Sequence, residues 1–322
     1  MSQKPRFISY IEYLSFRTLE PVVCVLPWNA TLKLGRVLGR LAHFLDPRHR
    51  RVVRENLRMC DLDMTEAEVR ETSKACFEHY GAMSLLMFHL LHMDREELER
   101  RVRMEGVEHW HAARSLGKGF IVLTGHYGCW EAMSLMLNLK GSAFSVIGRK
   151  LDNPLLDPYL QKLRSRWGNR VILKRGAMRE ALQVLKQGEG VGFLLDQDAL
   201  SGGIFIKFLG QWASTHSAAA VLAVKHEIPV LPVFSWPNPD GSISVRIDPH
   251  MIMPRTGDRE RDVWVATQIM TRCLEDQVRK DPRWWFWMHR RFKTRPVEGR
   301  SQPSPLPPPE WIQSVPSTVN RG

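Results

Sequence analysis

Residues 119–131 read Gly119-Phe-Ile-Val-Leu-Thr-Gly-His126-Tyr-Gly-Cys-Trp-Glu131 and join two different patterns. The apolar run 120–123 is typical of a buried strand, which Thr124 and Gly125 end. The segment 130–139 that follows has the amphipathic spacing of a helix. We therefore expect His126 at the carboxyl end of a strand and beside the start of a helix, where ligands bind in open α/β sheets.

A histidine and a carboxylate at this place indicate acid–base chemistry. Glu131 falls in the first turn of the expected helix, where a carboxylate is favoured, and it can reach back to the imidazole of His126. A histidine oriented by a carboxylate is a general base without a nucleophile of its own. We predict His126 and Glu131 as catalytic residues that activate a substrate hydroxyl; a surface pair formed by chance is the plain alternative.

Cys129 lies between these two residues and is a second candidate for chemistry. A Cys–His pair can make a nucleophile, and the first turn of a helix stabilises a thiolate. Most buried cysteines are inert packing, however, and we take that as the more common outcome.

The alternation of strand and helix patterns continues along the chain and predicts an α/β fold with a mostly parallel central sheet flanked by helices. We assign residues 1–101 to an N-terminal helical region, 102–296 to the α/β domain and 297–322 to a Pro-rich, mostly disordered tail, with 1–296 as one structural unit. The predicted strands are 119–124, 143–148, 170–174, 190–195, 229–235 and 243–248, and the predicted helices are 130–139, 154–167, 177–187, 214–226 and 260–280.

Further charged side chains follow the predicted strands. Arg149 comes after strand 143–148 and Arg164 lies on the next helix; arginine binds phosphate and carboxylate in a bidentate way. Asp196 and Asp198 come after strand 190–195 and could bind a metal, orient a base or recognise a basic partner. We predict these four as substrate-binding residues, with solvated surface charges as the alternative. No cluster of His, Cys and Asp completes a metal site, so no metal is predicted.

The composition favours an anionic partner. The 322 residues carry a net charge of +12 and are 43% hydrophobic, which excludes a disordered chain. Residues 284–296 cluster several of the 11 Trp with cations, a pattern that fits either a membrane interface above anionic headgroups or a grip on single-stranded nucleic acid. The five Cys form no C-x-x-C pair and indicate reduced thiols in the cytosol.

The N-terminal region has a membrane-facing interpretation. Residues 32–45 form a basic amphipathic pattern that can lie in a membrane surface, although an ordinary core-facing helix has the same spacing. No run reaches the ~18 uninterrupted apolar residues of a transmembrane helix. We predict peripheral attachment, with a single marginal span at 19–45 as the alternative.

Taken together, these blocks resemble the bacterial lipid A biosynthesis acyltransferases, the late lauroyl- and myristoyl-transferring enzymes of the lysophospholipid acyltransferase superfamily. The resemblance covers 7–296 and is carried by the blocks 126–131, Arg149 with Asn153-Pro154, 190–198, 205–210 and, most specifically, 285–296. Two positions depart from the family pattern: Cys129 stands where Asn is usual, and His216 stands in a stretch that is usually rich in small residues. Cys129 removes the hydrogen bonding that the family's Asn would provide as a guide, and His216 could change the acceptor pocket.

The resemblance implies transfer of a fatty acyl group from acyl carrier protein, or acyl-CoA, to a hydroxyl of a lipid A precursor at the cytoplasmic face of the bacterial inner membrane. It implies a glycerol-phosphate acyltransferase-like fold, His126 as base with Glu131, no metal or other cofactor and no covalent acyl-enzyme. We expect a monomer with an anionic lipid surface and no nucleic acid as partners. Acylation of an ornithine lipid or an aryl polyene precursor is the alternative; a basic nucleic-acid-binding protein would lack any recognised motif.

Overall fold

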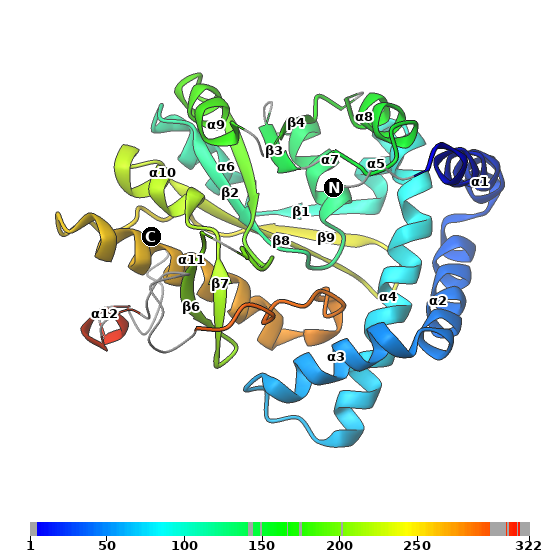
Figure 1. The fold of residues 1–322 in the computed structure, drawn as a ribbon. Coiled ribbons are helices and arrows are strands. Elements are labelled where there is room, and N and C mark those ends of the chain that lie inside the picture. The colour runs from blue at the N-terminus through cyan, green and yellow to red at the C-terminus, as the bar shows by residue number, and fades with distance from the viewer. Residues whose placement is uncertain are drawn as a thin grey trace.

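A mostly parallel sheet forms the centre of the molecule (Figure 1). The computed structural model describes residues 5–140, 144–148, 150–165, 167–173, 176–200, 202–296, 307, 309–313 and 315. These residues form a seven-stranded sheet of order β1-β9-β8-β2-β5-β3-β4, parallel throughout except between β8 and β9. The strands are β1 (Val102–Glu105), β2 (Phe120–Thr124), β3 (Phe144–Gly148), β4 (Arg170–Leu173), β5 (Gly190–Leu194), β8 (Val230–Pro237) and β9 (Ile243–Ile247). The predicted α/β fold is confirmed.

β2 is a central strand because it is apolar on both faces. All five of its side chains are buried, and it pairs in parallel with β5 on one side and β8 on the other. Such continuous apolar runs are typical of strands covered by helices on both faces. The strand β1 was missed by the sequence analysis: only Val102 of its four residues is buried, so it lacks the apolar run that marks the central strands.

Helices cover both faces of the sheet. α6 (Val107–Ser115) and α7 (Trp130–Lys140) pack on one face, in a core with Phe120 and Val122 of β2. α9 (Ala177–Lys186), α10 (Ala218–His226) and α11 (Arg259–Lys280) pack on the other, with Ile121 and Leu123. α8 (Leu156–Ser165) lies beside β4.

One predicted helix begins too early. The segment 214–226 was predicted to be helical, but β7 (Gln211–Thr215) forms an antiparallel hairpin with β6 (Ile204–Phe208), and α10 starts at Ala218. The reason is non-local: the five residues of β7 find their hydrogen-bonding partners on β6, which local periodicity does not reveal.

The N-terminal region is helical, with α1 (Arg6–Val25), α2 (Trp28–Leu45), α3 (Pro47–Met59), α4 (Glu66–His92) and α5 (Arg95–Arg101). A capping box between Thr65 and Glu68 begins α4. α2 and α4 approach closely, since a Cβ at Gly39 would lie 2.2 Å from the carbonyl oxygen of Phe77. Among the described helices, none has both the length and the apolar character that crossing a bilayer takes. The segment 19–45 is divided between α1 and α2, which meet at Pro27.

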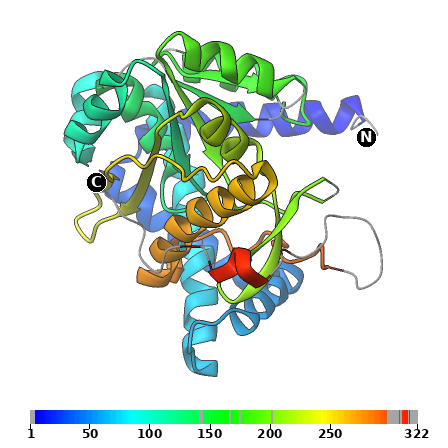
Figure 2. The same cartoon turned by 90° about the vertical axis from the view of Figure 1, so that its left-hand side faces the viewer.

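The predicted tail, 297–322, falls mostly outside the described residues. Within it, the short helix α12 (Pro309–Gln313) packs beside α11 (Figure 2). The ring of Trp311 lies 6.3 Å from that of Trp264.

Candidate active site

His126 and Asp196 form the centre of the site. His126 follows β2 and Asp196 follows β5, and because these strands are parallel neighbours with Thr124 opposite Leu194, their carboxyl ends meet at one edge of the sheet. Nδ1 of His126 lies 2.8 Å from Oδ1 of Asp196, and the backbone N–H of His126 donates to Oδ2 at 2.6 Å. A carboxylate at Nδ1 selects the tautomer with its proton there, so Nε2 is the basic nitrogen of the neutral ring.

Asp196 is ionised at neutral pH. Burial by itself would raise the pKa of Asp196, but the adjacent imidazole and the hydrogen bonds from His126 and Trp285 lower this pKa to about 2. The indole Nε1 of Trp285 donates to Oδ2 of Asp196 at 2.9 Å. An anion held this way can stabilise a positive charge that forms on the imidazole of His126.

Hydrogen bonds from two other segments, α4 and the Trp-rich block, hold the backbone at His126. The hydroxyl of Tyr80, on α4, donates to the carbonyl of His126 at 2.8 Å and to that of Trp284 at 3.0 Å. The backbone N–H of Phe286 donates to the same carbonyl of His126 at 3.0 Å. Gly128 has φ of +59°, and a Cβ there would lie 1.7 Å from the carbonyl oxygen of Ser235. These contacts fix the backbone of the turn that carries His126.

The Trp-rich block therefore has a different role from the one the sequence suggested. Trp285 and Trp287 are 1% and 0% exposed, with their rings packed at 4.5 Å, so neither can form part of a membrane belt or stack on a nucleic acid base. Both interpretations are wrong for these two side chains. The block instead supplies a hydrogen bond to Asp196 and backbone contacts to the His126 turn.

Glu131 and Arg164 contact each other. Nη2 of Arg164 donates to Oε1 of Glu131 at 2.6 Å, and both side chains are about one-fifth exposed. They line an apolar cavity of about 190 Å³ with Val146 and Gly192. Nε of Arg164 is buried and has no hydrogen-bond partner among the described residues. The catalytic role of Glu131 and the substrate-binding role of Arg164 stay predictions, and Arg149 lies outside the described residues.

Asp198 is held by hydrogen bonds to residues 284–296, the Trp-rich segment that is called the C-terminal block below. Its carboxylate accepts a hydrogen bond from the hydroxyl of Thr294 at 2.8 Å, and its backbone N–H donates to Nε2 of His289 at 3.0 Å. The fully buried Arg291 donates to the carbonyls of Gln197 and Ser214. These contacts hold the Asp196–Asp198 loop in place; the predicted substrate-binding roles of Asp196 and Asp198 stay predictions.

Cys129 does not have the properties of a nucleophile. It is 4% exposed, and burial raises the pKa of its thiol to about 12. Its backbone N–H donates to the hydroxyl of Ser235 at 3.1 Å. The structure thus favours the packing interpretation. Among the described residues, no group of three His, Cys, Asp or Glu side chains could hold a metal ion.

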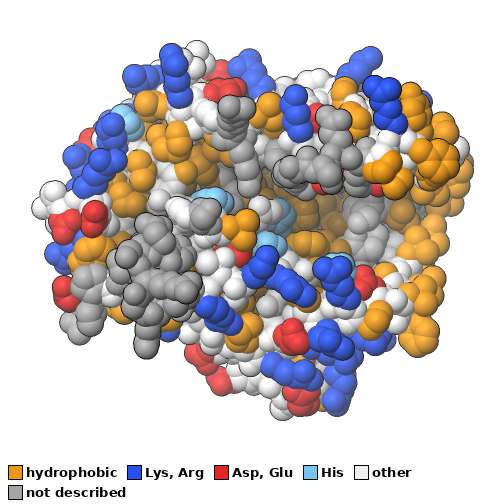
Figure 3. All heavy atoms as spheres, in the orientation of Figure 1, with side chains coloured by type: hydrophobic (Ala, Val, Ile, Leu, Met, Phe, Trp, Pro, Cys, Tyr) orange, Lys and Arg blue, Asp and Glu red, His pale blue; other side chains and the backbone are white. Residues whose placement is uncertain are grey.

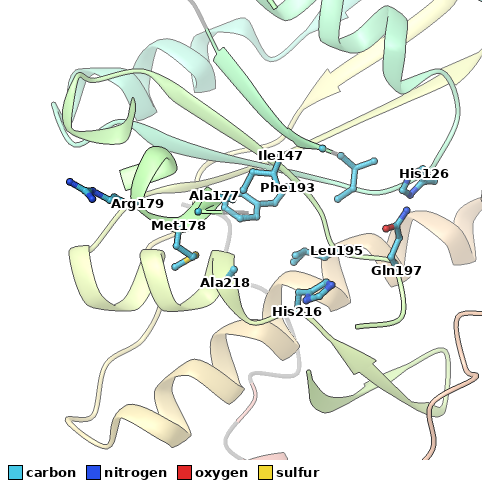
Figure 4. Close-up of a pocket in the computed structure, with 13 residues that line it drawn as sticks. His126, Ile147, Ala177, Met178, Arg179, Phe193, Leu195, Gln197, His216 and Ala218 are labelled. Carbon is cyan, nitrogen blue, oxygen red and sulfur yellow. The ribbon is translucent and has the colours of Figure 1, made fainter. Parts of the chain in front are cut away.

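Two hollows lie near His126. A pocket of about 660 Å³ extends from His126 and Gln197 across Phe193 and Leu195 toward Arg179 on α9 (Figure 4), and His216 also lines it. A groove of about 950 Å³ lies between α2, α4 and the C-terminal block. Trp130 and Phe286, whose rings lie 5.2 Å and 6.3 Å from that of His126, line this groove. The histidine thus lines the first hollow and contacts two aromatic side chains of the second.

Sequence reasoning missed several residues of the site. Tyr80, Trp285 and Arg291 act through contacts that span 46, 89 and 94 positions of sequence, respectively. The signal for the last two was present in the block 285–296, which was singled out for a different reason. Tyr80 had no specific signal, because a tyrosine in an apolar helix is ordinary core.

An acyltransferase fits this arrangement of a base without a nucleophile of its own beside an apolar pocket. Residues 5–294 match the family model of the bacterial lipid A biosynthesis acyltransferases, and the chain belongs to this family. Because the members of this family are O-acyltransferases, the protein is an O-acyltransferase.

The chain is similar over most of its length to several curated members of the family. It is 26% identical to the lipid A biosynthesis lauroyltransferase of Escherichia coli (strain K12), covering 85% of this chain and 89% of that protein. It is 27% identical to the lipid A biosynthesis palmitoleoyltransferase of the same strain, with coverage of 84% and 88%. A lipid A biosynthesis acyltransferase of Haemophilus influenzae is 26% identical, with coverage of 92% and 95%.

Proposed function

We propose that the protein transfers a fatty acyl group from the thioester of acyl carrier protein, or of acyl-CoA, to a hydroxyl of a lipid A precursor. The observation that carries this proposal is the His126–Asp196 pair, whose imidazole lines an apolar pocket and contacts Trp130 and Phe286 of a second groove. A thioester is already activated, so the enzyme needs a base and correct positioning rather than a nucleophile of its own.

The reaction follows from the tautomer of His126. Nε2 takes the proton of the acceptor hydroxyl as its oxygen attacks the thioester carbonyl carbon. The ionised Asp196, 2.8 Å from Nδ1, stabilises the imidazolium. When the tetrahedral intermediate collapses, the carbon–sulfur bond breaks, and the imidazolium returns the proton to the leaving thiolate. The products are an ester and a free thiol, with the base restored.

The 660 Å³ pocket suits the acyl chain of the donor. Its middle is formed by Ile147, Phe193 and Leu195, and one end opens at His126. An acyl chain lying along these side chains places its thioester beside the imidazole, and holding the reacting groups together in this way lowers the entropic cost of reaction.

Glu131 supports the site in this proposal by holding Arg164. Glu131 was predicted to stabilise the imidazolium; we assign this role to Asp196 instead, because Asp196 lies at Nδ1 of His126 and Glu131 lies against Arg164. The guanidinium of Arg164 lines the 190 Å³ cavity, where it can bind a polar group of a substrate.

We also propose that α1 and α2 attach the protein peripherally to the cytoplasmic face of the inner membrane. Large apolar side chains are exposed along both helices, and Figure 3 shows hydrophobic atoms gathered at the edge of the molecule where these helices lie. They include Phe7, Leu14, Val25, Val37, Leu41 and Phe44, of which Val25 is 84% exposed. Burying such a surface in lipid favours attachment, and the net charge of +12 favours an anionic surface.

The test is a reconstituted reaction with purified protein, lauroyl acyl carrier protein or lauroyl-CoA, and the lipid A precursor in micelles. Mass spectrometry of the lipid should show the added acyl group, and His126→Ala should abolish it. Ornithine lipid and an aryl polyene precursor are the competing acceptors. Transfer to one of these and none to the lipid A precursor would replace the proposed acceptor, and full activity of His126→Ala would refute the proposed base.

A further inference from the structure

The groove between α2, α4 and the C-terminal block combines an apolar floor with a cationic rim. Its floor includes Leu38, Phe77 and Leu85 from the two helices, together with Met288. Arg290 and Lys293 lie at its rim. Figure 3 shows the corresponding hollow at the centre of this face, with hydrophobic side chains inside it and Lys and Arg side chains along one edge. This is the character of a site for an amphiphile.

The two rim cations are available for an anion. Arg290 and Lys293 are exposed, and within the described ranges neither forms an ion pair with a carboxylate. The carbonyl of Arg290 accepts a hydrogen bond from the backbone N–H of Lys293 at 3.2 Å, so both belong to one turn. An Arg and a Lys on one turn match the oxygens of a phosphate group.

The acidic groups of the groove are already engaged. Asp46 contacts the ring of His49, with 2.6 Å between Oδ2 and Nδ1, and also caps α3. Asp198 accepts its hydrogen bond from Thr294. His289, which also lines the groove, accepts the backbone N–H of Asp198. Both carboxylates therefore have hydrogen-bond donors of their own, whereas Arg290 and Lys293 have no carboxylate partner within the described part of the chain.

The groove is continuous with the exposed apolar face of α2. Leu38 lines the groove and is 43% exposed, and its neighbours Leu34, Val37 and Leu41 are exposed on the same helix. At the opposite end, Trp130 and Phe286 line the groove and contact the ring of His126. An amphiphile could thus keep its chains along α2 while its headgroup reaches the base.

We infer that this groove is the acceptor site and that it holds a lipid with a phosphate-bearing headgroup, whose phosphate lies on Arg290 and Lys293 and whose acyl chains lie toward α2. The inference rests on the proposed function, since it assigns the second substrate of the same reaction. A lipid fits better than an acidic carrier protein because the groove is concave, has an aromatic and aliphatic floor and opens onto an apolar face.

The first experiment replaces the rim cations. Arg290→Ala with Lys293→Ala should raise the KM for the phosphorylated acceptor about 10- to 100-fold, as expected for loss of charge-assisted contacts, with little change in kcat. The penalty should disappear with the same acceptor after its phosphate is removed. Lys186→Ala with Arg259→Ala, two exposed cations outside the groove, is the matched control and should change neither constant.

Two results would overturn the inference: an unchanged KM for the acceptor, or a raised KM for the acyl carrier protein in its place. Hydrolysis of the acyl donor in the absence of acceptor depends only on the base and the donor pocket. The rate of this hydrolysis should therefore be the same in the double variant and the wild type. If the wild type transfers nothing to the phosphorylated glycolipid, the proposed function fails. Sedimentation with micelles of that lipid then still decides the site, since the double variant should bind them less than the wild type.

A second variant fills the groove without changing its charge. Ser84 is exposed, lines the groove and is placed on α4, so Ser84→Trp should block the acceptor while leaving donor hydrolysis intact. Ser115→Trp on α6, also at an exposed serine, is its control. Undiminished acyl transfer by Ser84→Trp, together with wild-type micelle binding, would show that the acceptor lies elsewhere.

Discussion

Nδ1 of His126 and Oδ1 of Asp196 lie 2.8 Å apart although 70 positions separate the two residues in the sequence. The contact exists because β2 and β5 are parallel neighbours, so that the residues following each strand meet at one edge of the sheet. Asp196 is nearly fully buried, whereas the side chain of His126 is 21% exposed. The buried acid thus supports a base that faces the substrate side.

The first prediction concerns Asp196. Asp196→Asn keeps the size of the side chain but removes the charge that stabilises the imidazolium, and an amide can select the wrong tautomer of His126. We expect kcat to fall about 10²- to 10⁴-fold, as for triads in which the acid is neutralised. Steady-state acyl transfer measures it, and a melting temperature close to wild type is the control for folding. A kcat near wild type would remove Asp196 from the mechanism.

The second prediction concerns the Glu131–Arg164 pair. Because Nη2 of Arg164 donates to Oε1 of Glu131, removing either partner leaves the other partly buried and unmatched. We expect Glu131→Gln and Arg164→Gln each to reduce activity, and the double variant to lose less than the product of the two losses. Strict multiplication of the losses would show that Glu131 acts separately, as it would if its partner were the imidazolium of His126.

The third prediction is a pH dependence of stability that comes from His79. Burial lowers the pKa of His79 from 6.5 to about 4, and its Nε2 lies 3.2 Å from the carbonyl oxygen of Gly128. Below pH 6.5 the imidazole of His79 is protonated in the unfolded chain but not in the folded protein. The contribution of neutral His79 to the free energy of unfolding is therefore complete above pH 6.5 and decreases as the pH drops toward 4.

This loss can be measured by urea unfolding. Between about pH 7 and about pH 5, the free energy of unfolding should fall by about 2 kcal/mol through this one group. His79→Gln keeps a hydrogen-bond donor for the carbonyl of Gly128 and removes the titrating group. The decrease in its free energy of unfolding between the same two pH values should therefore be smaller than that of the wild type by about 2 kcal/mol. An identical pH dependence in wild type and variant would contradict the prediction.

The fourth prediction concerns Gly128, in the turn after His126. Its φ is +59°, and an added Cβ would meet the carbonyl oxygen of Ser235 at 1.7 Å. Gly128→Ala should therefore displace the turn, lowering both stability and activity strongly. Gly188→Ala is the control: φ is +79° but nothing lies within 4 Å of the added Cβ, so only a backbone cost of about 1–3 kcal/mol is expected. Thermal melts and acyl transfer of the two variants decide this.

The fifth prediction concerns Cys129. A buried thiol whose pKa is raised to about 12 is not a thiolate at neutral pH. Cys129→Ala should retain most of its acyl transfer, and iodoacetamide should not modify this residue in the folded protein. Capture of an acyl group on Cys129, detected by mass spectrometry after mixing with the donor, would reverse the assignment.

The local sequence pattern was enough to predict the fold class, the position of His126 in the sheet and the protein family. The apolar runs and helical spacing predicted the α/β fold and set His126 at the end of β2, because burial on both faces of a strand leaves a direct mark in the sequence. The blocks 126–131, 190–198 and 285–296 also indicated the acyltransferase family, which the match over 5–294 confirms.

Only the tertiary structure decided how these blocks meet. Asp196, rather than a residue near His126 in sequence, lies at Nδ1 because the strand order brings β5 beside β2, and periodicity does not encode strand order. The same holds for Trp285, which the sequence placed at a surface and the fold buries against Asp196. Contacts between distant segments depend on how the sheet is assembled, whereas the strands and helices themselves depend mainly on the spacing of apolar residues.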